Sequence, residues 1–203
     1  MSKGKFIVLE GIEGAGKSRQ CRILTDTLVS RGVDAICTRE PGGAPLGEAL
    51  RTLILDPAYK PDALSELYMY LASRRDHLNH IVLPALEAGK TVVCDRFTYS
   101  SVAYQGYGRG LDPDFVRRVN EVTIAPLEVD LALFIDVTPE EGFKRKGGAD
   151  KDDRLERENM EFFDRVYYGF KQMVRSGELT AIDGSGEKEQ TAQKILKAVE
   201  SIL

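Results

Sequence analysis

The sequence has few cysteines, no excess of basic residues and no long apolar run. Its three cysteines, Cys21, Cys37 and Cys94, are odd in number and widely spaced, which argues against a disulfide framework and favours a reducing compartment. We interpret them as small core hydrophobes. Since 32 acidic side chains outnumber 28 basic ones and give a net charge of −4, a surface that wraps nucleic acid is not expected.

No apolar stretch is long enough to span a bilayer, and a strand-like run begins almost at once at residues 6–9. We therefore expect no membrane association, no signal peptide and a cytoplasmic location. With 42% hydrophobic and 30% charged residues, the composition is that of a soluble globular protein and excludes disorder. A length of 203 residues without an evident linker fits a single domain over residues 1–203.

Short β-branched runs alternate with longer stretches of helical period, which is typical of βαβ units. The candidate strands are residues 6–9, 33–38, 91–94, 131–137 and 179–182. The candidate helices are residues 17–30, 63–86 and 187–203, with a further helix that opens at Asp112-Pro113. The pattern predicts an α/β fold of three layers, in which helices flank a five-stranded parallel sheet.

One motif carries chemistry, and it lies between the first candidate strand and the first candidate helix. Its residues are Gly11, Ile12, Glu13, Gly14, Ala15, Gly16, Lys17 and Ser18, which match G-x-x-x-x-G-K-[ST]. Such a P-loop binds the phosphates of ATP through its backbone N–H groups and the helix N-terminus. Lys17 is expected at the β- and γ-phosphates, and Ser18 at Mg²⁺. A glycine-rich turn without a ligand is the alternative.

The strand over residues 91–94 leads into Asp95 and Arg96. A carboxylate at a strand end is suited to hold Mg²⁺ or its water beside the P-loop, although a simple Asp-Arg salt bridge is the alternative. A P-loop indicates that a nucleotide is bound but does not indicate which reaction follows. A GTP-dependent switch is disfavoured because the Asn-Lys-x-Asp motif is missing, and a non-catalytic subunit is disfavoured by the presence of Lys17, Ser18, Asp95 and Arg96 together.

Five segments resemble, in order and spacing, the thymidylate kinases of the P-loop nucleoside-monophosphate kinase group. The segments are residues 6–18, Thr38-Arg39-Glu40-Pro41-Gly42-Gly43, Asp95-Arg96-Phe97, Ala103-Tyr104-Gln105-Gly106 and Asp153-Arg154. The resemblance covers nearly the whole chain. It implies a P-loop kinase fold, a homodimer, and the Mg²⁺-dependent reaction ATP + dTMP to ADP + dTDP in dTTP biosynthesis. A kinase for another nucleoside monophosphate or for a deoxynucleoside is the alternative.

The resemblance also implies which residues grip the acceptor phosphate and sugar. Arg96 would clamp the phosphate, and a guanidinium fork matches phosphate oxygens in bidentate fashion. Arg51 looks like a second clamp. Glu13 would approach the sugar 3′-hydroxyl or the metal, and its alternative is a solvent-exposed side chain.

The remaining acceptor residues would surround the base. Tyr70 and Arg74 share a helix face. The resemblance makes Tyr70 the ring that stacks on thymine and Arg74 the donor to its O4, while a plain surface pair is the alternative. Ser101 would lie near the base N3. Tyr104 would fill the space beside the sugar C2′ and exclude a ribose, and packing in the core is the alternative. Gln105 would belong to the same wall of the acceptor pocket.

A charge-dense segment, approximately residues 144–157, matches the mobile lid of these kinases. The resemblance places Arg145 near the adenine or phosphates of ATP and Arg154 near the phosphates in transit. Residues 146–151 depart from the family because they lack its repeated arginines, which leaves Lys151 as a substitute cation.

Three further residues stand outside this assignment. Arg19 occupies a position where the family usually has threonine, and we have no physical account of it. His77 and His80 lie one turn apart on the long helix, without a third ligand nearby in the sequence. We interpret the two histidines as a pair on the helix surface rather than as metal ligands.

Overall fold

The computed structural model describes residues 4–147 and 153–203. Its centre is a five-stranded parallel sheet in the order β2-β3-β1-β4-β5. The strands are β1 (Phe6–Glu10), β2 (Ala35–Arg39), β3 (Thr91–Asp95), β4 (Leu131–Asp136) and β5 (Thr180–Asp183). The α/β class and the parallel sheet are confirmed, and every predicted strand is found to within two residues at each end.

The helices follow the strands in alternation. They are α1 (Lys17–Ser30), α2 (Pro45–Leu55), α3 (Ala63–His77), α4 (Leu83–Glu87), α5 (Thr98–Ser101), α6 (Pro113–Ile124), α7 (Pro139–Lys146), α8 (Met160–Arg175) and α9 (Lys188–Glu200). Two π-helical segments, η1 (Leu78–Val82) and η2 (Val102–Gly108), and a 3₁₀ turn, η3 (Leu155–Arg157), complete the set.

The helix expected over residues 63–86 is interrupted by η1. Pro84 follows this π-helical turn, and a proline has no N–H to donate to the carbonyl one turn earlier. The hydrogen-bond pattern therefore changes where the proline enters the helix.

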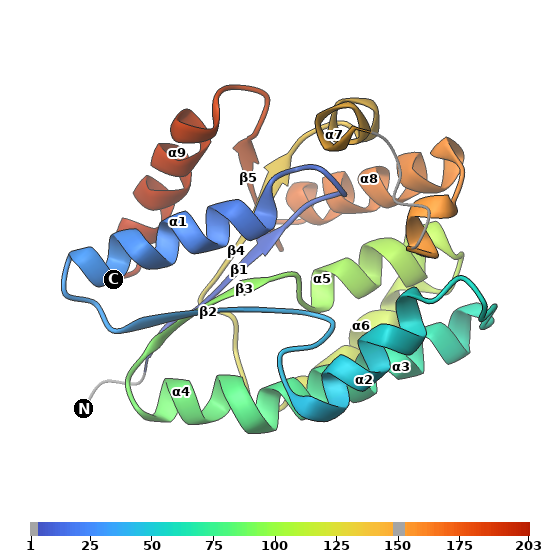
Figure 1. Cartoon of the computed structure of the whole chain (residues 1–203), viewed down its shortest axis with the longest axis horizontal. Coiled ribbons are helices and arrows are strands. Elements are labelled where there is room, and N and C mark those ends of the chain that lie inside the picture. Colours follow the sequence, from blue (N-terminus) through green and yellow to red (C-terminus); the bar gives the residue numbers. More distant parts are fainter. Residues whose placement is uncertain (1–3, 148–152) are drawn as a thin grey trace.

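Helices cover both faces of the sheet, as the three-layer prediction requires. Figure 1 shows α1 and α9 on one side of the sheet and α3 and α4 on the other. No helix within residues 4–147 and 153–203 combines the length and the apolar character needed to cross a membrane. Of the expected lid, residues 148–152 lie outside the described residues.

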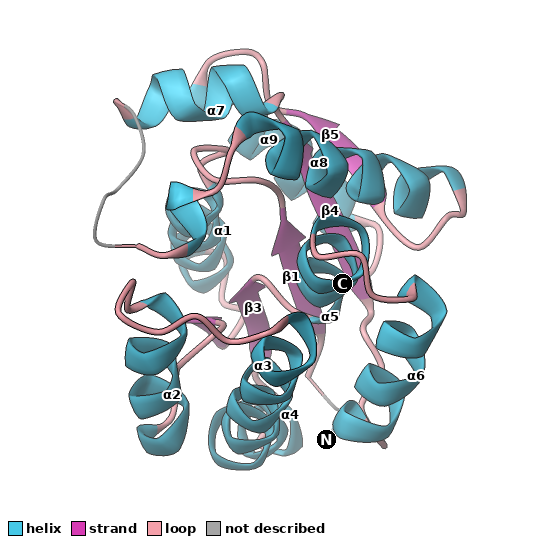
Figure 2. Cartoon of the chain, turned by 90° about the vertical axis from the view of Figure 1, so that its right-hand side faces the viewer, coloured by secondary structure: helices cyan, strands magenta, loops and turns pink. Residues whose placement is uncertain are grey.

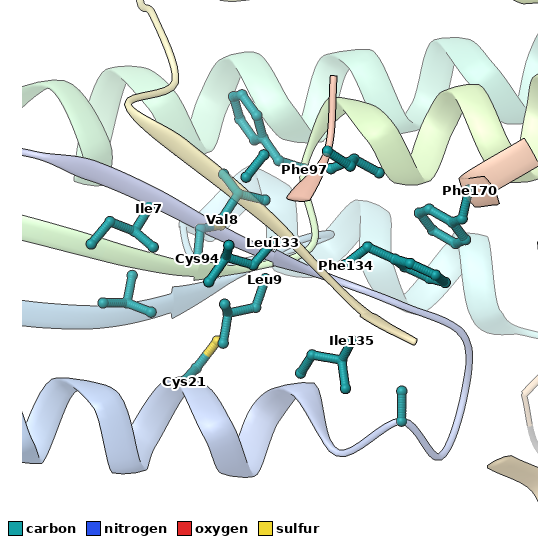
Figure 3. Close-up of a cluster of buried hydrophobic side chains, with 14 of the residues drawn as sticks. Ile7, Val8, Leu9, Cys21, Cys94, Phe97, Leu133, Phe134, Ile135 and Phe170 are labelled. Atoms are coloured by element: carbon teal, nitrogen blue, oxygen red, sulfur yellow. The ribbon is translucent and has the colours of Figure 1, made fainter. Parts of the chain in front are cut away.

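The core lies along the central strands. All five residues of β1 and of β3 are buried, and Figure 3 shows Cys21 of α1 pointing at Leu9. Cys21 and Cys94 are buried, which confirms two of the three cysteine assignments. The third is wrong. Cys37 is exposed because it lies on β2, the edge strand of the sheet, in which only Ala35 is buried.

The parallel strands bring the ends of β1, β2 and β3 to one edge of the sheet. The chain leaves β1 into the P-loop, β2 into residues 40–44 and β3 into α5. Figure 2 views the molecule from the side on which α7 and α2 lie, with α7 above and α2 below. Ligands of open α/β sheets bind outside the carboxyl ends of the strands, so this edge is where a site is expected.

Candidate active site

The P-loop, residues 11–18, connects β1 to α1. Its φ angles are +73° at Gly14 and +90° at Gly16, a left-handed conformation that glycine adopts without the steric cost of a side chain. No side chain of the described residues caps the N-terminus of α1. The first N–H groups of α1 therefore remain available to an anion.

Lys17 opens α1 and is buried. Its Nζ donates a hydrogen bond to the carbonyl of Ile12 at 2.6 Å. Burial and the nearby charge of Arg96 lower the pKa of Lys17 to about 8. A desolvated ammonium held by a neutral carbonyl is poised to exchange that partner for a phosphate.

Asp95, at the end of β3, lies beside the P-loop. The Ser18 hydroxyl donates a hydrogen bond to Asp95 Oδ2 at 2.5 Å. Asp95 is buried, and its Oδ1 has no hydrogen-bond partner among the described residues. A buried carboxylate oxygen without a donor is costly. Since Mg²⁺ takes a hydroxyl and one or two carboxylates together with substrate phosphates, Ser18 and Asp95 fit this ion.

A cavity of about 240 Å³ opens between the P-loop, the end of β3, α2, α3 and η2. It is lined by these predicted site residues: Glu13, Gly14, Lys17, Ser18, Arg51, Tyr70, Arg74, Asp95, Arg96, Ser101, Tyr104 and Gln105. The other P-loop residues, Gly11, Ile12, Ala15 and Gly16, do not line it. The structure therefore brings the predicted nucleotide and acceptor residues to one continuous space.

Arg96 adopts a positive φ of 69°, which is uncommon for a residue with a side chain. Its Nη2 donates to Glu13 Oε1 at 2.7 Å, and its Cζ lies 5.0 Å from the centre of the Tyr104 ring. The Tyr104 hydroxyl donates to Glu13 Oε2 at 2.5 Å. Glu13, Arg96 and Tyr104 thus form one hydrogen-bonded group, in which Arg96 pairs with Glu13 and not with Asp95.

This group bears on two alternatives that the sequence left open. The Glu13 side chain is only 13% exposed, so it is not a solvated loop residue. Burial raises the pKa of Glu13, but the charges of Arg96 and Lys17 outweigh it and leave the pKa below its ordinary value. The ring of Tyr104 does pack in the core, edge-on to Phe170, while its hydroxyl reaches the cavity.

Arg74 of α3 is buried, with 1% of its side chain exposed, so it is not part of a surface pair. Its Nε donates to Glu40 Oε2 at 2.7 Å and its Nη2 to the carbonyl of Phe97 at 3.0 Å. Its Nη1 donates to the hydroxyl of Ser101 at 3.1 Å and to Asn120 Oδ1. Four of its five N–H groups therefore have acceptors among the described residues, which fixes the guanidinium at the cavity wall.

Tyr70 and Arg51 line the cavity from neighbouring helices. Tyr70 lies one turn before Arg74 on α3, and burial raises the pKa of its hydroxyl well above the ordinary value. Arg51 of α2 donates from Nη1 to the carbonyl of Pro41 at 3.0 Å, and burial lowers its pKa. Like Lys17, Arg51 donates to a neutral carbonyl, so its positive charge is available to an anion.

Gln105 is tied to a buried carboxylate that the sequence analysis did not identify. Its Nε2 donates to Glu66 Oε1 at 2.8 Å. Arg154 lies 2.7 Å from the other oxygen of Glu66, and its Nε donates to the carbonyl of Ile54 at 2.9 Å. Arg109 also pairs with Glu66. The guanidinium of Arg154 is thereby held by Glu66 and Ile54, and Arg154 is not among the residues that line the cavity.

Arg145 of α7 is not among the residues that line the cavity. Its Nη1 and Nη2 donate to the carbonyls of Gly184 and Ser185 at 2.8 and 3.1 Å, and its Nε donates to Glu141 at 3.0 Å. The structure does not bring Arg145 or Arg154 to the cavity, and their expected contact with phosphates stays a prediction. Lys151 lies outside the described residues.

The interpretation of His77 as a surface residue is wrong. His77 is fully buried, and its Nε2 and Nδ1 lie 2.7 Å from Thr38 Oγ1 and 3.1 Å from Glu40 Oε1. It is buried because α3 packs beneath the loop that follows β2. His80 is 61% exposed, as expected. Among the described residues, no group of three or more His, Cys, Asp and Glu side chains is arranged to hold a metal.

The residues that support or line the site and were missed include Glu40, Glu66, Asn120, Lys146 and Glu156. Glu40 lies in the segment of residues 38–43, and a carboxylate directly before Pro-Gly-Gly is the sequence feature that could have indicated it. Glu66 and Asn120 look like ordinary helix residues in the sequence. Their partners at the site, Gln105 and Arg74, lie at least 39 residues away along the chain, so the spacing of residues in the sequence does not indicate these contacts.

A parallel sheet with a P-loop after its first strand, and a buried aspartate at the end of the adjacent strand, defines a P-loop nucleotide-binding protein. A sequence model described as thymidylate kinase matches residues 9–195. The chain belongs to the thymidylate kinase family.

Individual relatives agree in sequence and in structure. A thymidylate kinase of Psychrobacter sp. is 43% identical over 205 residues, with 98% of each chain covered. One from Halothermothrix orenii is 43% identical over 204 residues, with 99% of each covered. The crystal structure of a thymidylate kinase from Ehrlichia chaffeensis superposes with a TM-score of 0.80 at 32% identity, covering 97% of this chain and 99% of that one.

Proposed function

We propose that the chain, as a single domain, transfers the γ-phosphoryl group of ATP to dTMP and releases ADP and dTDP. The observation that carries the proposal is the shared cavity, which joins the P-loop and Asp95 to an arginine-lined acceptor pocket. Relatives with over 40% identity along nearly the full chain are named thymidylate kinases. Those names do not favour the alternative of a kinase for another nucleoside monophosphate or for a deoxynucleoside.

The donor half of the site is the P-loop. Its backbone N–H groups and the uncapped N-terminus of α1 receive the phosphates of ATP, and Lys17 exchanges the Ile12 carbonyl for them. Ser18 and Asp95 are the residues that would hold Mg²⁺. When bound there, the ion neutralises charge on the β- and γ-phosphates.

The acceptor half lies across the cavity. Arg96 and Arg51 grip the acceptor phosphate, since both guanidinium groups line the cavity. The carboxylate of Glu13, held by Arg96 and Tyr104, accepts a hydrogen bond from the 3′-hydroxyl of the acceptor sugar. The ring of Tyr104 occupies the space that a ribose 2′-hydroxyl would need.

The base is read from α3 and η2. Tyr70 offers its ring for stacking, and Arg74 offers its remaining N–H to a carbonyl oxygen. An arginine cannot accept a hydrogen bond, so the amine of cytosine would find no partner there. Ser101 and Gln105 close the same wall.

The acceptor phosphate oxygen is already an anion, so the reaction needs no strong general base. The rate comes from holding the two phosphates in line and from neutralising their charge. Lys17 and Arg96 supply positive charge from opposite halves of the cavity. A cytoplasmic homodimer, with no nucleic-acid or membrane partner, belongs to the proposal, and light scattering tests the dimer.

A coupled ADP-release assay tests the reaction. With ATP and Mg²⁺, the acceptors are dTMP, dUMP, UMP, CMP, AMP, GMP and thymidine, and Lys17→Ala serves as the blank. We expect a strong preference for dTMP and a loss of about a hundredfold or more in the blank, as for the removal of a transition-state cation. A preference for another acceptor would reject the assigned pocket, and equal turnover by Lys17→Ala would reject the mechanism.

A further inference from the structure

Helix α7 rests directly on the P-loop at a contact between two glycines. A Cβ built on Gly14 would lie 1.9 Å from the carbonyl oxygen of Gly142, and one built on Gly142 would lie 2.3 Å from the carbonyl oxygen of Glu13. Such distances leave no room for a side chain on either residue. The backbone of α7 is therefore fixed at close range against the loop that receives the donor phosphates.

Lys146 lies one turn after Gly142 and on the same face of α7. Side chains of a helix lean toward its N-terminus, so that of Lys146 reaches back over the turn that contains Gly142. Lys146 accordingly lines the cavity together with Gly14 and Lys17. Its neighbour Arg145 turns to the loop after β5 instead.

The partner of Lys146 also belongs to the cavity wall. The Lys146 Nζ forms an ion pair with Glu156, which is 6% exposed and lines the same cavity. The Lys146 side chain is 35% exposed, so it is not enclosed by the protein. Lys146 and Lys17 therefore line one cavity, from α7 and from the P-loop.

Resting on the proposed phosphoryl transfer, we infer that Lys146 contacts the γ-phosphoryl group of ATP and stays with it during the reaction. An acceptor phosphate oxygen forms a bond to the γ-phosphorus, while the bond from that phosphorus to the β–γ bridging oxygen breaks and its electron pair leaves with ADP. Lys146 remains protonated and moves no proton. It supplies positive charge to the γ-phosphoryl group from α7.

The first test compares two lysines of the same helix. Lys144 is exposed and does not line the cavity, so Lys144→Ala removes an equal charge as a control. We expect Lys146→Ala to lower kcat/KM for ATP by about a hundredfold and Lys146→Arg to recover much of it, as for a preorganised cation at developing charge. An effect within about twofold, or an equal loss in Lys144→Ala, would overturn the inference.

A second variant separates contact with phosphate from neutralisation of Glu156. If Lys146 served only to balance that carboxylate, Glu156→Gln would restore activity to Lys146→Ala. We expect the double variant to stay as slow as Lys146→Ala, because the missing charge acts on the phosphoryl group. Recovery toward the wild-type rate would contradict the inference.

A binding measurement without an acceptor tests the role of Lys146 independently of which acceptor the enzyme phosphorylates. Calorimetry with Mg²⁺ and no acceptor gives the Kd of ADP and of a non-hydrolysable ATP analogue. We expect Lys146→Ala to weaken the analogue about tenfold and to leave ADP unchanged, because only the analogue carries a γ-phosphate. If the wild type failed to phosphorylate dTMP, the proposed function would fall while this test still decided Lys146, and an unchanged analogue Kd would overturn it.

Discussion

Gly14 of the P-loop and Gly142 of α7 touch backbone to backbone, so that a Cβ on Gly14 would fall 1.9 Å from the Gly142 carbonyl oxygen. Because the contact involves main-chain atoms, it cannot relax by the rotation of a side chain. Two segments separated by more than a hundred residues are thereby held in one geometry.

Gly142→Ala should lower the free energy of unfolding, although alanine has a higher helix propensity than glycine. Its new Cβ would lie 2.3 Å from the Glu13 carbonyl oxygen, and relief of such overpacking costs about 1 to 3 kcal/mol. Urea denaturation measures the free energy of unfolding. Gly106→Ala is the matched control, because its Cβ would have no neighbour nearer than 3.5 Å apart from adjacent residues and its own helix. A Gly142→Ala protein as stable as wild type would show that α7 moves freely from the P-loop.

Glu40→Gln should be strongly destabilising, because it leaves Arg74 as a buried charge without its carboxylate. Both side chains are at most 3% exposed, and breaking such a pair costs about 3 to 5 kcal/mol. Glu200→Gln is the control, since Glu200 pairs with Arg31 where both are 49% exposed and the cost is at most about 1 kcal/mol. Thermal and urea unfolding measure both, and equal losses would contradict the assignment.

ATP affinity should fall as the pH rises through the pKa of Lys17, about 8. The lowered pKa means that the free enzyme loses the ammonium charge at a pH where an ordinary lysine keeps it. Below pH 8 the lysine is mainly protonated and binds phosphate, and above it the affinity decreases by up to about tenfold per pH unit. Titrations of ATP between about pH 7 and about pH 9.5 follow this change.

Lys17→Arg is the control for that titration, because a guanidinium remains protonated over the whole range. Its ATP affinity is expected to be lower than in wild type and independent of pH. A pH dependence of the same form in Lys17→Arg would assign the titration to another group.

Two Tyr104 variants should separate the ring from the hydroxyl. Tyr104→Ala opens the space beside the sugar and should raise the relative kcat/KM for UMP over dUMP. Tyr104→Phe keeps the ring but loses the 2.5 Å hydrogen bond to Glu13, so it should lower turnover of both acceptors and preserve their ratio. An unchanged ratio in Tyr104→Ala would remove the ring from sugar discrimination.

The elements that the sequence predicted well are those that local physics decides. The β-branched runs became the five strands, and the P-loop took its place between β1 and α1 because its glycines permit the required turn. The long helix over residues 63–86 was predicted without its π-helical segment. The effect of Pro84 on the preceding turn is local too, but helical period alone does not reveal it.

The site was predicted in part for the same reason. Lys17, Ser18 and Asp95 belong to segments whose order fixes their position at the strand ends. The environments of Arg154 and His77 were not predictable, because both are set by partners distant in sequence, Glu66 and Glu40. The sequence alone does not distinguish a polar side chain that contacts water from one that contacts a buried carboxylate.

The sequence by itself determined the α/β architecture and the P-loop, since strand period and glycine conformation act over a few residues. Only the tertiary structure decided which cations face the cavity. It turned Arg145 and Arg154 to other partners and brought Lys146 over the P-loop. The reason is physical: the orientation of a long charged side chain depends on which acceptors the packed chain places within its reach, and those acceptors come from other elements.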